Sequence, residues 1–503
     1  MAGRYYLGID IGTTMSKVAY IDDSGSQPRA EIFRFKNFGG QGLIPSAILY
    51  DESLTPVAFG EKAIEEHVLN GHNGYLVREF KVKLGEKIHI VDDIYLEGDA
   101  AYRDFLEHIK ELLISHIYIE SNDVLTEESD PLGSGVICVT HPAYTEDLSD
   151  NFGERVGKLA MHVFGKPDIE ITAINEPAAI TQYIDSQSAK PILLMKPRSI
   201  LVVDSGGGTT DFCWALAKYR WRRSRPPLNV LGGSRLDKGG RDIDRMIYQV
   251  VKEALGSEMR GNLNQEILLR AIGDIKNSYD WDSDFEIQVE SQTVSLSSHV
   301  LRNCARPVID AIVGGVETYM DKSKKDKLPI QLLVLAGGNS RVPMLREALQ
   351  EKIGDVEIVQ VPFEDMQTSA ALGAALHGNS KDPVRWRLAY TIQLKFAKGR
   401  PQTLWKKDTE IGTKNHTKKI LIDYDETAMS PVDILFVDSR GASTTRELVI
   451  KFTEPVEPTY LSVQFQIDAN GYLRYVVQPQ GRQLPEYRHV IRQYVLNTMP
   501  AIH

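Results

Sequence analysis

The sequence has little cysteine, no long apolar run and no surplus of positive charge. Its 503 residues include three cysteines, Cys138, Cys213 and Cys304, too few and too scattered for a disulfide framework or a metal site. No apolar run is long enough to span a bilayer, and the N-terminus lacks a secretory signal pattern. The formal net charge of -10 argues against nucleic acid or an anionic membrane as a general partner. We therefore expect a cytoplasmic protein.

The stretch Leu201–Asp211, LVVDSGGGTTD, has the pattern of a buried strand that runs into a glycine turn. Three successive glycines allow several backbone N–H groups to converge on an anion. Asp204 and Asp211 would repel a bare phosphate, so their presence suggests a hard cation between them and the phosphate. Magnesium commonly uses one or two carboxylates together with phosphate oxygens and waters. A glycine-rich hairpin turn without a ligand is the alternative for this stretch taken alone.

The segment Tyr5–Tyr20, YYLGIDIGTTMSKVAY, repeats this pattern near the N-terminus. Asp10, Gly12, Thr13 and Thr14 correspond in order to the aspartate, glycine and threonines of the later stretch. In both copies the turn leads into another alternating apolar segment, whereas a P-loop leads into a helix after a lysine. The repeat predicts a duplicated subdomain with two facing hairpins that hold a phosphate chain and its cation from both sides.

Between and after these hairpins the pattern alternates between strands and helices, which indicates an α/β layered architecture. A helix is expected over Asp104–Ile117, and a second over Arg245–Ala254 after the glycine pair Gly239 and Gly240. Beyond Gly378 the pattern changes to six short alternating strands without clear helices. This part predicts a small antiparallel β domain, with a hairpin turn at Asp468–Gly471.

Seven motifs carry a resemblance to a known family. They are DIGTT, the lysine of FKVKLG, VTHPAY, INEPAA, DSGGGTTD, KGGRDID and AGGNSRVP. In this order they resemble the 70-kilodalton heat-shock chaperones, within the actin, hexokinase and heat-shock ATPase superfamily. The resemblance implies an actin-like (ribonuclease H-like) two-lobed α/β ATPase with duplicated subdomains, followed by a small antiparallel β-sandwich. The implied parts are an ATPase domain over 1–378, a linker over 379–389, a peptide-binding-like β domain over 390–480 and a tail over 481–503.

The resemblance also implies roles for individual residues. Asp10 and Asp204 would hold Mg²⁺ through its waters, and Lys81 would place a cation beside the γ-phosphate of ATP. Glu176 would orient the attacking water, and Thr209 would contact the γ-phosphate or that water. The expected catalytic residues are thus Lys81, Glu176, Asp204 and Thr209. The expected nucleotide-binding residues are Gly12, Thr13, Thr14, Gly206, Gly207, Gly208, Thr209, Gly239, Gly240, Lys276, Gly337, Gly338, Asn339 and Arg341.

Several positions depart from the family pattern. Of the family's glutamate, lysine and arginine on the adenosine-site helix, Lys276 alone is present, and Asn277 replaces the arginine expected to stack on the base. Arg241 stands where the family has a glutamate. The apolar-acidic linker is missing, and the residues after the last strand are too few for the family's helical lid. These departures predict a divergent, lidless member that binds and releases peptides quickly, and they leave the base preference open.

The expected function is slow hydrolysis of ATP to ADP and phosphate with Mg²⁺, coupled to the binding of a protein or peptide client by the β domain, with cochaperones as further partners. The basic segment 218–227, KYRWRRSRPP, reads as a solvated hairpin tip, or as a local site for nucleic acid, an acidic protein or a membrane surface. Two alternatives remain open: an actin-like filament-forming ATPase and a small-molecule kinase of the same superfamily.

Overall fold

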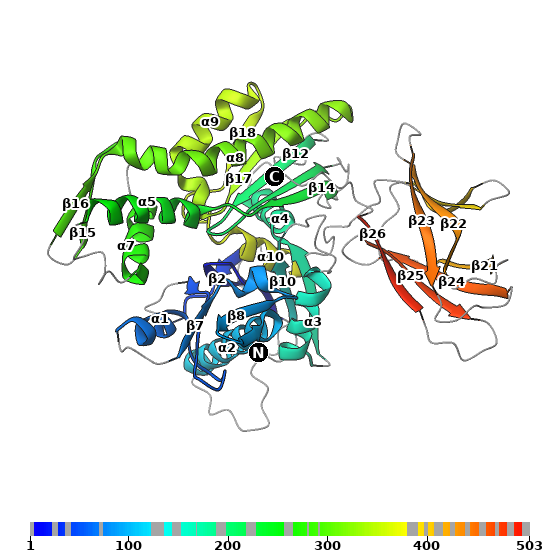
Figure 1. Cartoon of the computed structure of the whole chain (residues 1–503), viewed down its shortest axis with the longest axis horizontal. Helices are drawn as coiled ribbons and strands as arrows, with labels where there is room; N and C mark the ends of the chain where they lie inside the picture. The colour runs from blue at the N-terminus through cyan, green and yellow to red at the C-terminus, as the bar shows by residue number, and fades with distance from the viewer. Residues whose placement is uncertain are drawn as a thin grey trace.

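The computed structural model (Figure 1) shows a mixed α/β chain. The structure describes residues 5–22, 29–35, 42–69, 74–121, 135–142, 152–166, 168–187, 198–217, 228–255, 265–278, 281–289, 292–379, 391–396, 401–406, 416–422, 428–437, 443–451, 459–467, 472–479 and 487–494. The expected linker, the turn at Asp468–Gly471 and the basic segment 218–227 fall outside these residues, apart from residue 379 at the start of the linker. Within the described residues, no helix is both long and apolar enough to cross a membrane.

Two mixed sheets organise the larger part of the chain. The first contains β1 (Tyr5–Asp10), β2 (Met15–Asp22), β3 (Arg29–Ile32), β4 (Ile44–Pro45), β10 (Gly135–His141) and β11 (Ile169–Asn175). The second contains β12 (Arg198–Ser205), β13 (Thr210–Ala217), β14 (Leu228–Leu236), β17 (Leu332–Ala336) and β18 (Glu357–Gln360).

The two sheets share one strand order. It reads β3-β2-β1-β10-β11 in the first sheet, where β4 also pairs with β2, and β14-β13-β12-β17-β18 in the second. In each, the central strand is antiparallel to the strand that follows it and parallel to a later one. This shared order agrees with the duplication expected from the two glycine hairpins.

Two helices lie between the sheets (Figure 1), α4 (Glu176–Gln187) and α10 (Ser369–Asn379). Helix α10 packs against β1, β2 and β10, while α4 packs against β12 and β13, so each helix reaches the sheet of the other half. The helices approach so closely that a Cβ on Gly373 would lie 1.8 Å from the carbonyl oxygen of Ala179, and this approach is possible because glycine has no side chain. The two halves are thus joined by a layer of small residues.

The remaining elements are attached to these sheets. In the first half they are β5 (Ala47–Tyr50), β6 (Pro56–Phe59), α1 (Gly60–Leu69), β7 (Tyr75–Arg78), η2 (Phe80–Lys83), β8 (Lys87–Val91), β9 (Ile94–Glu97), α2 (Gly98–Ser121) and α3 (Phe152–Phe164). In the second half they are α5 (Gly240–Ala254), α7 (Gln265–Ser278), β15 (Phe285–Val289), β16 (Gln292–Leu296), α8 (Ser298–Lys325), η3 (Gly338–Arg341) and α9 (Pro343–Ile353).

Two helices differ in extent from the sequence prediction. Helix α2 contains the predicted Asp104–Ile117 and extends it at both ends. Its apolar stripe is buried in the core of the first half, and the helix packs against α3, η2, β6 and β9. Helix α5 begins at Gly240, so the start predicted at Arg245 was wrong. The reason is local: the Gly239 N–H donates to Asp242 Oδ2 at 2.9 Å, which satisfies a backbone donor at the helix start.

The C-terminal strands form two four-stranded antiparallel sheets, ordered β20-β19-β22-β23 and β21-β24-β25-β26. Their bounds are β19 (Thr391–Phe396), β20 (Gln402–Trp405), β21 (His416–Ile422), β22 (Ala428–Val437), β23 (Ser443–Lys451), β24 (Thr459–Ile467), β25 (Tyr472–Pro479) and β26 (Tyr487–Tyr494). The antiparallel pairing agrees with the sequence prediction, which missed the short β20 and the last strand β26.

Candidate functional site

The two glycine turns meet. A Cβ on Gly207 would lie 2.3 Å from Thr14 Oγ1, and a Cβ on Gly208 would lie 2.8 Å from Thr13 Cγ2. Side chains at these two glycines would therefore collide with the first turn. The two glycines therefore allow the close approach of the two turns, which brings the threonine side chains of the first turn beside the backbone of the second.

Hydrogen bonds hold each turn in shape. In the first, Ser46 Oγ donates to the Gly12 carbonyl oxygen at 2.7 Å, and the Ser46 N–H donates to the Thr14 carbonyl oxygen at 2.8 Å. In the second, the Gly206 N–H donates to the Thr209 carbonyl oxygen at 2.9 Å. The start of α5 is fixed to the same turn, because the Gly240 N–H donates to the Gly206 carbonyl oxygen at 3.0 Å.

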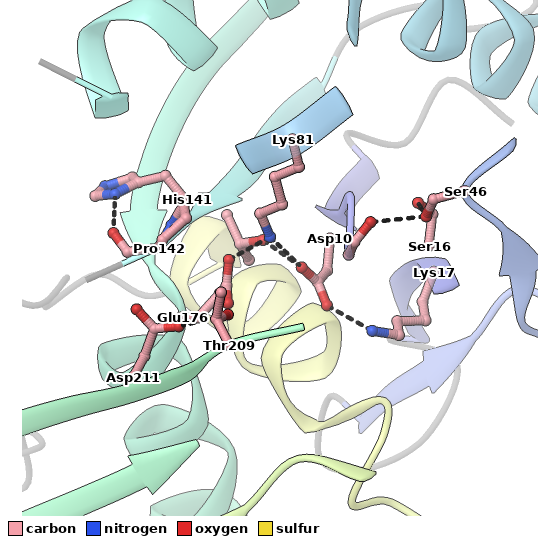
Figure 2. A network of polar contacts seen from close by, with 12 residues as sticks. Asp10, Ser16, Lys17, Ser46, Lys81, His141, Pro142, Glu176, Thr209 and Asp211 are labelled. Atoms are coloured by element: carbon pink, nitrogen blue, oxygen red, sulfur yellow. Dashed lines mark hydrogen bonds and ion pairs between the residues drawn. The ribbon is translucent and has the colours of Figure 1, made fainter. Parts of the chain in front are cut away.

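A charged network lies beside the first turn (Figure 2). Asp10 Oδ2 accepts a hydrogen bond from Lys17 Nζ at 2.9 Å, and Asp10 Oδ1 accepts one from Thr140 Oγ1 at 2.7 Å. Lys81 Nζ lies 3.6 Å from Asp10 Oδ1 and donates to Glu176 Oε1. Burial alone would raise the pKa of Asp10, but the charges of Lys17 and Lys81 outweigh it and lower the pKa to about 2.

Lys81 and Glu176 form a buried ion pair. The Lys81 side chain is 4% exposed and that of Glu176 is 11% exposed. Burial by itself would lower the pKa of Lys81, yet the carboxylates of Glu176 and Asp10 raise it, so the ammonium stays charged. Burial raises the pKa of Glu176 despite the opposing charge of Lys81. A carboxylate with a raised pKa is a better proton acceptor at neutral pH.

The second turn contributes Asp204, Thr209 and Asp211. Burial raises the pKa of Asp204, and the negative charges of Glu176, Asp211 and Asp10 raise it further. Thr209 Oγ1 donates to Asp211 Oδ2 at 3.3 Å. The charge of Asp204 therefore interacts with carboxylates from both halves, and a cation at this place would relieve their mutual repulsion.

The residues predicted to contact the nucleoside gather at the start of α5. Lys276 Nζ donates to the Gly240 carbonyl oxygen at 2.8 Å and lies 2.6 Å from Asp244 Oδ1. Asn339 Nδ2 donates to Ser205 Oγ at 2.9 Å, while its buried Oδ1 has no hydrogen-bond partner within the described residues. Buried polar atoms usually have a hydrogen-bond partner, so Asn339 Oδ1 fits a hydrogen-bond donor on a bound ligand.

The remaining predicted nucleoside residues belong to one short element, η3 and the glycine before it, but each faces a different neighbour. A Cβ on Gly337, where φ is +81°, would lie 2.5 Å from Asp204 Oδ1, so this glycine allows the close approach of the two strand ends. Gly338 faces the side chain of Gln367. Arg341 is turned toward Phe363, with its guanidinium carbon 4.2 Å from the ring centroid and Nη2 donating to the Phe363 carbonyl oxygen. The Arg341 guanidinium is thus already bound to Phe363, through its ring and its carbonyl oxygen.

An ion pair joins the two halves beside Gly208 of the second turn, where a Cβ would lie 2.8 Å from Arg241 Nη2. Arg241, in the first turn of α5, pairs with Glu79, which precedes η2 and Lys81. Arg245 Nη2 lies 3.6 Å from the same Glu79 oxygen. Burial and the charge of Arg245 lower the pKa of Arg241 to about 10, so the guanidinium remains charged at neutral pH.

These residues fit a nucleoside polyphosphate with a magnesium ion. The two glycine turns offer backbone N–H groups and threonine hydroxyls, and Lys81 offers a fixed positive charge. No group of three or more metal-ligating side chains occurs among the residues described. Magnesium in such sites relies on one or two carboxylates together with phosphate oxygens and waters. Asp10 and Asp204 would be those carboxylates.

Lys17 and Thr140 belong to the network but were not predicted from the sequence. A signal for Lys17 was present, because it is an isolated lysine in the alternating strand MSKVAY, and a short hairpin pairs it with Asp10. Thr140 follows Val139, the parallel partner of Ile9 on the neighbouring strand. Its role depends on a long-range pairing that local sequence does not show.

Comparison with known proteins places the chain among relatives of one kind. The family model described as Hsp70 protein matches residues 136–482, more than half of the chain. The "Chaperone protein DnaK" of Thermoplasma volcanium is 25% identical over 397 residues, which cover 75% of this chain and 59% of that protein. The "Chaperone protein HscA homolog" of Acinetobacter baumannii is 24% identical over 395 residues, with the same coverage. The "Chaperone protein DnaK" of Halobacterium salinarum is 23% identical over 505 residues, which cover 96% of this chain and 74% of that protein. The chain spans about six-tenths of the length of the first two relatives.

Proposed function

The chain belongs to the Hsp70 family, and on that premise we propose that it binds ATP with Mg²⁺ between its two glycine turns and hydrolyses it slowly to ADP and phosphate. Membership implies an actin-like, two-lobed ATPase architecture. The observation that carries the proposal is the contact between Thr13 and Thr14 of one turn and Gly208 and Gly207 of the other, with Lys81 and Glu176 beside it.

The proposed division of labour follows from what each residue can offer. The N–H groups of Gly207, Gly208 and Thr209 and the hydroxyls of Thr13 and Thr14 would bind the phosphate oxygens, while the Gly206 N–H shapes the turn through its bond to the Thr209 carbonyl oxygen. Asp10 and Asp204 would hold the metal through its waters, and Mg²⁺ would neutralise phosphate charge during transfer. Phosphoryl transfer asks the protein mainly for positioning and charge neutralisation.

Lys81 and Glu176 would act at the terminal phosphate. The Lys81 ammonium, fixed by two carboxylates, would stabilise the negative charge that develops on the phosphoryl oxygens. A Glu176 oxygen would orient a water molecule and accept its proton. Gly239, Gly240, Lys276, Gly337, Gly338 and Asn339 would receive the nucleoside, with Arg341 joining them after leaving Phe363.

We further propose that the nucleotide domain spans 1–378 and a linker spans 379–389. The strands within 390–480 would then bind a protein or peptide client, together with β26, which lies within the segment 481–503 that the sequence predicted as a tail. Client affinity would depend on the bound nucleotide, and cochaperones would act on the cycle. A cytoplasmic location stays a prediction.

The test of the ATPase is turnover of ATP to ADP and phosphate, with and without a candidate acceptor. We expect Asp204→Ala and Lys81→Ala to lower the rate by about a hundredfold or more, the loss typical when a transition-state charge contact is removed. Lys83→Ala is the matched control, because Lys83 lies two residues away, is exposed and pairs with Glu86. Wild-type rates in Asp204→Ala and Lys81→Ala would refute the site, and phosphate transfer to the acceptor would indicate a kinase.

A further inference from the structure

Lys17 places a second fixed ammonium group on the carboxylate proposed to hold the metal. It is the third residue of β2, its side chain is 12% exposed, and its Cα is the cross-strand partner of Asp10. Lys17 Nζ lies 2.9 Å from Asp10 Oδ2, and Lys81 Nζ lies 3.6 Å from Asp10 Oδ1. Figure 2 shows Asp10 between these two ammonium groups.

The Lys17 ammonium has hydrogen-bonding capacity to spare. An ammonium group carries three donors, and the bond to Asp10 is the one hydrogen bond that Lys17 Nζ makes within the described residues. Nζ lies at the first glycine turn, since a Cβ on Gly12 would be 3.3 Å away from it. The unused donors are therefore next to the turn that continues into Thr13 and Thr14.

The charge of Lys17 also acts beyond Asp10. Burial raises the pKa of Glu176 and of Asp204, and the positive charge of Lys17 opposes that rise at both groups. Lys17 is thus close to carboxylates from both halves of the site. This is the region where a divalent cation would have to neutralise phosphates and carboxylates together.

We propose that Lys17 is a second phosphate-binding cation, which supplies part of the positive charge otherwise expected from Mg²⁺ and so makes nucleotide binding weakly dependent on divalent metal. This inference rests on the proposed nucleotide function. Lys17 shares its charge between Asp10 and the phosphates, while Lys81 remains paired with Glu176.

The test measures the affinities of ADP and AMP for the full chain by calorimetry, with Mg²⁺ and with EDTA. Lys17→Met removes the charge and keeps the length of the side chain. We expect this variant to bind ADP about ten- to a hundredfold more weakly in EDTA, the value of one charge-assisted hydrogen bond, and to lose less in Mg²⁺. AMP, which lacks the β-phosphate, should bind with little change. Lys17→Arg should keep most of the metal-free affinity, and Lys83→Met is the control for a lysine outside the site.

A second measurement needs no variant. Removal of Mg²⁺ from the wild-type chain should weaken ADP binding by less than about tenfold, or about 1.4 kcal/mol. A loss of about a thousandfold would overturn the proposal, and so would a Lys17→Met variant with wild-type affinity for ADP in EDTA. If the wild-type chain bound no nucleotide in either condition, the proposed function would fail together with this inference. If the wild-type chain binds ADP and Lys17→Met binds it equally well in EDTA, this inference is refuted and the proposed function is not.

Discussion

His141 is a buried histidine at the end of β10, next to the charged network. Its Nδ1–H donates to the Pro142 carbonyl oxygen at 2.9 Å, and its ring is 3% exposed. Burial, together with the charge of Lys81, lowers the pKa of His141 from 6.5 to about 4. The folded state is therefore more stable with a neutral His141 ring than with a protonated one.

This shift predicts a pH dependence of folding stability. The contribution of a neutral buried histidine is complete above the unfolded pKa of 6.5 and is lost as the pH falls toward the folded pKa of about 4. Over this window His141 should remove up to about 3 kcal/mol from the free energy of unfolding. In urea titrations from pH 7 to pH 4, the free energy of unfolding should fall less steeply for His141→Leu than for the wild type. His162→Leu, at an exposed position, should keep the wild-type slope, and equal slopes in all three proteins would contradict the prediction.

Residues in the glycine turns could be identified from the sequence, because Asp10 and Asp204 lie at fixed distances from their glycines and threonines. Lys17 left only a weak signal, as an isolated lysine across a short hairpin from Asp10, and Thr140 left none, because it reaches Asp10 through a long-range strand pairing. The distance between Arg241 and Glu79 is also a product of folding, because the two residues belong to different halves of the chain. Local motifs therefore predict the parts of the site that lie within one turn, and long-range pairing determines the rest.

At the scale of elements, the contact between α4 and α10 depends on one glycine. A Cβ on Gly373 would lie 1.8 Å from the Ala179 carbonyl oxygen and 2.4 Å from its carbonyl carbon, so no side chain fits without moving a helix. The structure also places Gly8 of β1 against α10, where a Cβ would lie 2.2 Å from the Ala371 carbonyl oxygen. Helix α10 is thus held closely on two sides.

Gly373→Ala should lower the free energy of unfolding by about 1–3 kcal/mol, the usual cost of overpacking a tight contact. The matched control is Gly314→Ala in α8, where a Cβ would have no neighbour within 4 Å. There the alanine should stabilise by about 0.5–1 kcal/mol through helix propensity. Chemical denaturation measures both, and a Gly373→Ala variant as stable as the control would contradict the tight packing.

The existence of these elements could be predicted from periodicity, but some of their ends could not. The apolar stripe of α2 follows the helical repeat and is buried as expected. The start of α5 was placed too late, because Gly239 and Gly240 read as a turn until Asp242 and the carbonyl oxygens of the second turn are seen to bind their N–H groups. The short β20 has too few residues to show a period of its own.

At the scale of the whole molecule, the Arg241–Glu79 ion pair joins the two halves across the site. Both side chains are partly exposed, 22% and 35%, so the pair should be worth about 0.2–1 kcal/mol and should weaken in salt. We expect Arg241→Glu to release bound ADP about two- to fivefold faster at low ionic strength, with a smaller effect at high salt.

The matched control restores the pair in reverse. The double variant Glu79→Arg with Arg241→Glu should return the release rate toward that of the wild type. Stopped-flow release of a fluorescent ADP analogue measures all three proteins. Equal rates for the wild type and Arg241→Glu at low salt would show that the ion pair has no part in closing the site.

In the proposed function, one chain couples nucleotide hydrolysis to the binding of a protein client. The most direct test is the affinity of the full chain for an unfolded peptide, measured in saturating ATP and in saturating ADP. We predict that the two affinities differ by about tenfold or more, a coupling free energy of about 1.4 kcal/mol, and that Asp204→Ala loses the difference. Equal peptide affinities of the wild-type chain in ATP and ADP would show that nucleotide state does not control client binding.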